Sequence, residues 1–213
     1  MKKIVLIALA VVVLLVLLAA VFRAPLKQFL YGAITDDMFV PADNDSFDPG
    51  PALGSRFPGL TALYQGERIS LIEDFAGEKG TVLMASRSFD WCPYCMKQMI
   101  QLQETADAYA AAGIGLVAIT YDSPELQQGF IDEHGITIPV LSDIDALSFK
   151  TLGILNPDYQ PGEHHYGIPY PGMIVIDPDG TVVGKLFLEG YSTRVDSAAA
   201  LEFADQALGA ARR

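Results

Sequence analysis

The chain contains two cysteines, Cys92 and Cys95, and their spacing constrains its fold and chemistry more than any other feature. A disulfide between them closes almost no loop, so it adds little stability through the entropy of the unfolded chain. One such pair supplies too few ligands for a structural zinc site built from four cysteines and histidines. Two cysteines are also too few for a small disulfide-rich scaffold. The spacing therefore predicts a redox-active pair that is repeatedly oxidised and reduced.

A continuous apolar run covers residues 4–22 without a charge or a proline. At about 1.5 Å per residue, it is long enough to span a hydrocarbon core of roughly 30 Å. A cleaved signal usually has a shorter apolar core and small residues at its cleavage site, which bulky Val21 and Phe22 do not supply. We therefore predict a transmembrane helix, an uncleaved anchor over residues 1–23 in a bacterial inner membrane, with the C-terminal domain in the periplasm. A cleaved and secreted chain is the alternative.

Residues 24–52 are rich in aspartate and proline and lack sustained hydrophobic periodicity. This composition is typical of an exposed acidic linker. A calcium loop of the EF-hand type does not fit, because Phe47 stands at a ligand position. The whole chain is acidic, with 26 aspartates and glutamates against 14 lysines and arginines, which argues against a nucleic-acid partner. The folded domain is expected over residues 53–213.

Short apolar runs alternate with amphipathic segments from about residue 53 onward. Ser123-Pro124 is a strong helix start, and the sequence Asp-Pro-Asp-Gly at residues 177–180 is a turn between two strands. Alternating strands and helices, followed by a hairpin and a last helix, predict a mixed sheet with helices on both faces. Strands are expected over residues 81–86, 115–121, 138–141, 172–177 and 181–188, and helices over residues 93–112, 123–134, 142–152 and 194–211.

The cysteine pair follows a predicted strand and begins a predicted helix, with Pro93 at the first helical position. Free N–H groups and the positive end of that helix stabilise a thiolate. Cys92 is therefore expected to be exposed, to have a lowered pKa and to attack, whereas Cys95 lies one turn deeper and resolves the mixed disulfide. A metal site that adds His164 and His165 is the rival use. Adjacent loop histidines are usually solvated, so neither a metal nor a cofactor beyond the disulfide is expected.

The motif Trp91-Cys92-Pro93-Tyr94-Cys95 after an apolar strand resembles the active site of the thioredoxin fold, and its Pro-Tyr dipeptide is similar to that of glutaredoxins. The wider pattern resembles the AhpC/TSA redoxin family, a peroxiredoxin-like branch. This resemblance covers roughly residues 53–211 and implies a thioredoxin-like, three-layer α/β/α fold with a mixed central sheet. The segments that carry it are residues 54–58, 71–80, 87–92, 116–120 and 166–177.

The resemblance also implies roles for residues outside the cysteine pair. Pro171 matches the family's cis-proline, which would place the backbone of Tyr170 beside the cysteines as a platform for an extended substrate segment. Trp91, Pro93 and Tyr94 would shape the rim of the site. The implied partners are protein or small-molecule disulfides, or hydroperoxides, together with an electron donor that the sequence does not identify.

The chain departs from two better-known members of this superfamily. Ser86 stands where thioredoxins carry a buried acid, and Phe89 stands where typical peroxiredoxins carry a threonine, with Ser88 displaced by one residue. Arg87 and Asp90 are further candidates for activating Cys92 or moving a proton.

These departures favour a membrane-tethered thiol–disulfide oxidoreductase over a peroxiredoxin-like peroxidase in which Cys95 resolves a Cys92 sulfenate. A metallochaperone or binding module is a third reading, which the short cysteine spacing disfavours. Substrate, redox direction and oligomeric state stay open.

Overall fold

The computed structural model describes residues 22, 31–43, 45–70 and 72–212. The chain divides into two compact units, Met1–Asp37 and Met38–Arg213, and the second unit carries the cysteine pair. The predicted membrane anchor over residues 1–23 falls almost wholly outside the described residues. Within the described part of the chain, no helix has the length and apolar character needed to cross a membrane.

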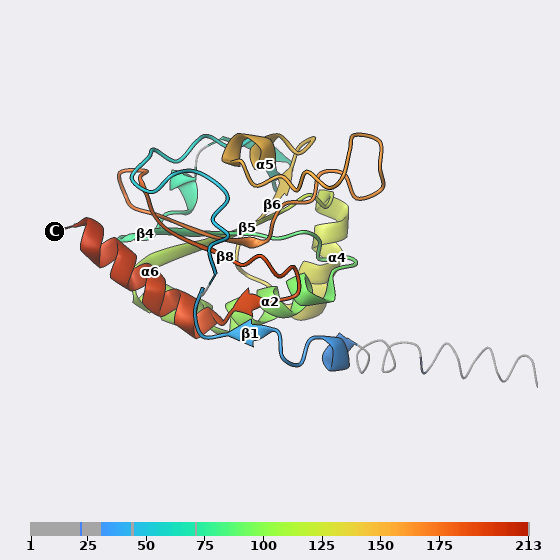
Figure 1. Cartoon of the computed structure of the whole chain (residues 1–213), viewed down its shortest axis with the longest axis horizontal. Coiled ribbons are helices and arrows are strands. Elements are labelled where there is room, and N and C mark those ends of the chain that lie inside the picture. The colour runs from blue at the N-terminus through green and yellow to red at the C-terminus, as the bar shows by residue number, and fades with distance from the viewer. Residues whose placement is uncertain (1–21, 23–30, 44, 71, 213) are drawn as a thin grey trace, which may run out of the picture. The chain divides into compact units, whose positions relative to one another are not determined.

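A mixed sheet lies at the centre of the second unit (Figure 1). It has seven strands in the order β3-β2-β6-β5-β4-β7-β8. Strands β4, β5 and β6 run parallel to one another, whereas β7, β8 and β2 join the sheet antiparallel to their neighbours. The bounds are β2 Ala62–Tyr64, β3 Glu67–Ile69, β4 Gly80–Ala85, β5 Ile114–Thr120, β6 Val140–Asp143, β7 Gly172–Ile176 and β8 Val182–Phe187.

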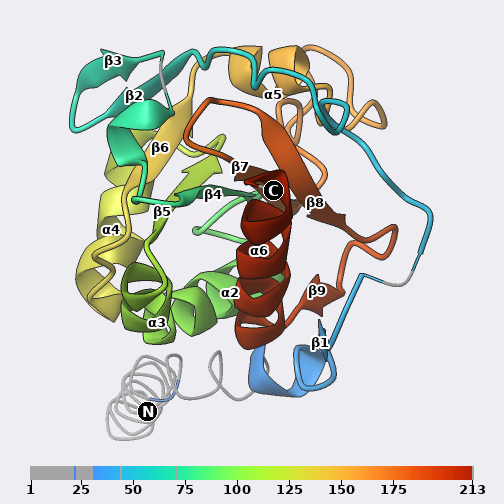
Figure 2. The same ribbon diagram turned by 90° about the vertical axis from the view of Figure 1, so that its left-hand side faces the viewer.

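Helices cover both faces of this sheet, which gives the predicted three layers (Figure 2). Side chains alternate along β4, so Val82 and Met84 pack into the core on one face, and Leu83 and Ala85 into the core on the other. Four helices pack on the first core: α2 Pro93–Glu104, α3 Ala106–Ala111, α4 Pro124–His134 and α6 Ser197–Ala211. Helix α5, Leu147–Leu152, packs on the second core. A 3₁₀ turn, Glu73–Phe75, precedes β4.

The predicted thioredoxin-like arrangement is confirmed, with local corrections. The helix expected over residues 93–112 breaks at Thr105, whose hydroxyl donates to the carbonyls of Gln101 and Leu102. The third strand lies two residues later than expected, so residues 142–143 end β6 and α5 begins only at Leu147. Even so, the Asp143 carboxylate accepts the backbone N–H groups of two residues in the first turn of α5.

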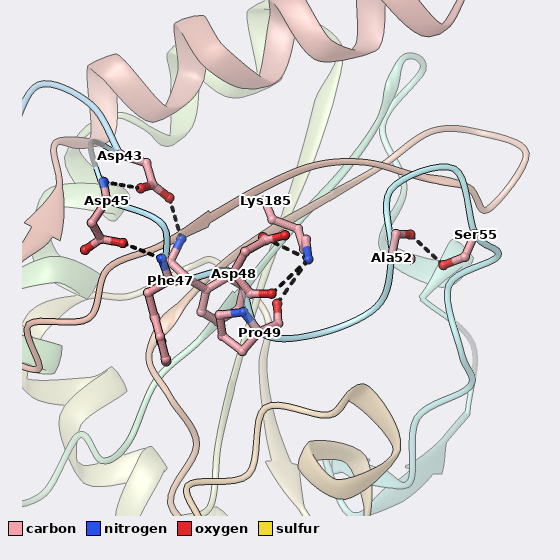
Figure 3. A network of polar contacts seen from close by, with 9 residues as sticks. Asp43, Asp45, Phe47, Asp48, Pro49, Ala52, Ser55 and Lys185 are labelled. Carbon is pink, nitrogen blue, oxygen red and sulfur yellow. Dashed lines mark hydrogen bonds and ion pairs between the residues drawn. The ribbon is translucent and has the colours of Figure 1, made fainter.

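Residues 38–43 and 45–49, called the N-terminal strap from here on, pack along the domain rather than forming an exposed linker. Strand β1, Phe39–Val40, pairs in parallel with β9, Arg194–Val195, which the sequence had placed in the last helix. The Asp43 carboxylate then accepts the backbone N–H group of Phe187 at the open edge of β8, and the Asp45 carboxylate accepts that of Glu189 just beyond it. Figure 3 shows the two aspartates of the strap together with Asp48 and Lys185.

These acids fold onto the domain because their side chains satisfy edge donors that have no neighbouring strand. The Asp48 carboxylate also pairs with Lys185 at 2.9 Å. The compact unit therefore begins at Met38, well before the expected residue 53.

Candidate active site

Strand β4 and helix α2 bring the cysteine pair to the end of the sheet. The chain leaves β4 at Ala85, passes through a short loop and enters α2 at Pro93, as the sequence predicts. Cys92 caps the helix, and its sulfur accepts the backbone N–H of Cys95 at 3.3 Å. The two cysteines form a disulfide across a Cα–Cα distance of 5.3 Å. A reduced Cys92 thiolate would therefore meet a free helix N–H and the positive helix end.

Both sulfur-bearing side chains are fully buried, at 0% exposure, so the expectation of an exposed Cys92 is wrong. Arg87 contacts the Cys92 sulfur and Tyr191 packs on Arg87, and these two side chains are called the lid from here on. The Arg87 guanidinium donates to the Cys92 sulfur at 3.3 Å and also to the Tyr191 carbonyl. It lies 5.2 Å from the Tyr191 ring centre and 5.6 Å from that of Trp91. Burial lowers the pKa of Arg87.

The Cys95 sulfur has a guanidinium of its own, which the sequence analysis missed. Arg194, in β9, is 2% exposed, and its Nη2 lies 3.7 Å from the Cys95 sulfur. Burial, followed by the charge of Arg87, lowers the pKa of Arg194 to about 9. The two residues are 99 positions apart in sequence, and no local pattern marks Arg194 as part of the site.

A buried aspartate fixes the loop that delivers Cys92. The Asp122 carboxylate, at the end of β5, accepts the Phe89 N–H at 2.7 Å and the Thr120 hydroxyl at 3.0 Å. The Ser88 hydroxyl accepts the next two backbone N–H groups of the loop, those of Asp90 and Trp91. Burial raises the pKa of Asp122. Asp90 itself is exposed and contributes its backbone to this network.

Aromatic rings surround the pair on the rim that the sequence predicted. The Trp91 indole N–H donates to the Tyr121 hydroxyl at 2.8 Å, and its ring centre lies 5.0 Å from that of His165. Tyr94 meets Tyr191 edge to face at 6.1 Å. His165 thus packs on the rim, and no group of three metal-ligating side chains occurs among the described residues.

Tyr170 and Pro171 lie next to β7, but not in the predicted form. No peptide bond in the described ranges is cis, so the expected cis bond before Pro171 is wrong. The Tyr170 N–H already donates to the Ile154 carbonyl at 2.7 Å, which removes it as a donor to substrate. Pro171, Gln98 and Arg194 line a space of ≈ 10 Å³, about the room that one water needs.

Both residues at which the chain departs from the better-known enzymes are buried. The Ser86 hydroxyl is buried and makes no hydrogen bond in the described structure. Phe89 is buried and stacks on Phe130 with ring centres 4.9 Å apart. The position of the peroxiredoxin threonine is therefore used for core packing, and it offers no hydroxyl to Cys92.

The model of the AhpC/TSA family matches residues 53–185, which include both cysteines and most of the sheet. The chain belongs to the AhpC/TSA family. This AhpC/TSA protein is 31% identical over 131 residues to a Mycobacterium tuberculosis protein named as a peroxiredoxin, a match that covers 61% of this chain and 81% of the relative. It is 28% identical over 136 residues to the thiol-disulfide oxidoreductase ResA of Bacillus thuringiensis, covering 63% and 69%.

Solved structures agree on the fold. Peroxiredoxin 6 of Arenicola marina superposes with a TM-score of 0.66 at 17% identity, over 77% of this chain and 76% of that one. Because its relatives are peroxiredoxins and thiol–disulfide oxidoreductases, this AhpC/TSA protein is an enzyme of one of these two kinds.

Proposed function

We propose that this AhpC/TSA protein is a thiol–disulfide oxidoreductase that works through Cys92 and Cys95. One observation carries the proposal: the two sulfurs form a disulfide at the start of α2, with a guanidinium 3.3 Å from the Cys92 sulfur. A helix N-terminus and a cation both favour the thiolate, which is the reactive form of cysteine. Cys92 is the attacking residue because it caps the helix and meets both groups.

In the reducing direction, the Cys92 thiolate attacks one sulfur of a substrate disulfide. The Cys92–substrate bond forms while the substrate's own S–S bond breaks, and the departing sulfur takes up a proton. The Cys95 thiolate then attacks the Cys92 sulfur, re-forms the internal disulfide and releases the second substrate thiol. Two electrons pass from the pair to the substrate, and an external dithiol restores the reduced enzyme. Arg87 lies over Cys92 and must shift for substrate sulfur to approach.

A peroxidase reaction is the second candidate, and the M. tuberculosis relative named as a peroxiredoxin favours it. Cys92 would attack a hydroperoxide and become a sulfenate, which Cys95 would convert to the disulfide with loss of water. Phe89 weighs against this route, because no hydroxyl stands where peroxiredoxins place their threonine.

Stopped-flow kinetics on the reduced protein separate the two. Disulfide exchange predicts fast, Cys92-dependent reduction of insulin and slow loss of hydrogen peroxide. Rapid peroxide consumption that Cys92→Ser abolishes would reverse this ranking.

We also infer that residues 1–23 anchor the enzyme in a bacterial inner membrane with its C-terminal domain in the periplasm. The support is the charge-free apolar run over residues 4–22 and the lack of a small-residue cleavage site. Protease added to spheroplasts should degrade the domain. Without protease, the chain should be found at its full length in the membrane fraction. Full protection from protease would overturn the orientation, and a shortened chain in the medium would show that the segment is cleaved.

A further inference from the structure

Arg194 is a buried cation whose oxygen partners are all uncharged. It is 2% exposed; its Nε donates to the Gln98 side-chain carbonyl at 3.0 Å, and its Nη1 donates to the carbonyls of Tyr191 and Thr193. None of the three ion pairs found among the described residues involves it. Burying a charge without a counter-charge is costly. An arginine held in this way indicates that an anion forms beside it during the enzyme's cycle.

Among the described residues, the guanidinium has one further polar partner, the sulfur of Cys95, at 3.7 Å from Nη2. That sulfur is neutral in the disulfide and becomes a thiol or a thiolate when the pair is reduced. Burial alone would raise the pKa of the Cys95 thiol, because Cys95 is fully buried. A guanidinium within hydrogen-bonding reach opposes that effect. The Cys95 thiolate is therefore the missing counter-charge.

Resting on the proposed disulfide exchange, we infer that Arg194 is a catalytic residue whose charge stabilises the Cys95 thiolate. In the oxidising direction, a substrate thiolate attacks the Cys92 sulfur, the Cys92–Cys95 bond breaks and Cys95 leaves as a thiolate. A leaving thiol with a lower pKa leaves faster. In the reducing direction, the same thiolate is the nucleophile that resolves the mixed disulfide. Because reduction creates the anion that Arg194 lacks, the arginine also makes the pair a stronger oxidant.

The fold fixes both the side chain and the backbone of Arg194. Its Nε bond to Gln98 ties it to α2, the helix that carries Cys95. Its backbone N–H donates to the Met38 carbonyl at 2.8 Å, and the N–H of Asp196 donates to the Val40 carbonyl at 2.8 Å. The strap therefore fixes the backbone of β9 while α2 fixes the side chain. The strap belongs to the site, although it lies outside the span of the family match.

The test compares the full-length protein with Arg194→Met and Arg194→Lys. Equilibration in glutathione buffers, followed by trapping of free thiols, gives the equilibrium constant for disulfide formation. Arg194→Met is expected to raise that constant at least tenfold, which makes the pair more reducing by about 30 mV. Arg194→Lys should recover most of the change because it keeps the charge. Lys79→Met removes another cation, one that pairs with Asp205 and contacts neither the strap nor the sulfurs, and should leave the constant unchanged.

A second measurement follows the pKa of Cys95, first with Arg194 in place. In Cys92→Ser, the thiolate absorbance of Cys95 should titrate below the ordinary cysteine value of about 8.5 despite complete burial. Adding Arg194→Met should raise that pKa by at least one unit.

Titration of Cys95 at or above the ordinary value, or an equilibrium constant that Arg194→Met leaves within twofold, would overturn the inference. Both readouts are independent of turnover. A protein that passes them but neither reduces insulin nor oxidises a dithiol substrate would refute the proposed function and leave the role of Arg194 standing.

Discussion

Replacing Arg87 by methionine should raise the pKa of Cys92 by about one unit. The guanidinium lies 3.3 Å from the Cys92 sulfur, within reach of a charge-assisted hydrogen bond to a thiolate. Hydrogen bonds to charged groups contribute about 1.5–3 kcal/mol, and the partial exposure of Arg87 argues for the lower end of that range. Since one pKa unit corresponds to about 1.4 kcal/mol, the loss amounts to roughly one unit. At any pH well below both pKa values, the thiolate fraction should then fall about tenfold.

The assay uses Cys95→Ser as the background, so that Cys92 is the only thiol. Thiolate absorbance against pH gives the pKa directly. The alkylation rate is a poorer readout, because removing Arg87 also uncovers the sulfur. The Cys92 pKa of Arg87→Lys should lie between that of the unchanged background and that of Arg87→Met. The matched control is Arg56→Met, which removes an exposed arginine that pairs with Glu73. An unchanged Cys92 pKa in Arg87→Met would refute the view that this guanidinium activates the thiol.

Three further results are expected. Tyr191→Ala should speed the reduction of the native disulfide by dithiothreitol several-fold at unchanged stability, because Tyr191 is 63% exposed yet helps to cover Cys92; an unchanged rate would contradict the lid. Burial raises the pKa of Asp122, so the folded state holds that proton more tightly, and the free energy of unfolding should fall as pH rises from about 4 through the raised pKa. Asp122→Asn should flatten this part of the stability curve in urea titrations at several pH values, and an identical slope would rule the explanation out. Gly172→Ala should lower the free energy of unfolding by about 1–3 kcal/mol, because the added Cβ would overlap the ring of Phe187, and a smaller loss would mean that the ring moves aside.

The central strands could be predicted because their signals are local. Residues 80–85 and 114–120 are largely apolar runs that begin at or just after a glycine, and β4 and β5 lie within a residue of the predicted spans. The start of α2 at Pro93 follows from proline's fixed backbone geometry and missing N–H. The fold class then followed from the order of these elements.

The rest of the site depends on long-range pairing, which single-sequence patterns do not encode. Arg194 reaches Cys95 only because β9 pairs with β1, and two-residue strands carry no periodicity. The aspartates of the strap have the composition of a linker, yet they meet β8 because its edge offers free N–H groups. The burial of Cys92 was missed for the same reason, since Tyr191 reaches Arg87 from 104 residues away.

The strap also decides how the domain would respond to a mechanical pull. Tension on the chain before Met38 would meet the backbone bonds to Arg194 and Asp196 first, and the side-chain bonds of Asp43 and Asp45 afterwards. Each bond is worth only about 1 kcal/mol, so the strap would peel in steps, well before the sheet yields. The first step frees the backbone of Arg194, the residue beside Cys95. A stretched chain would thus shift the redox balance of its disulfide while the central sheet stays intact.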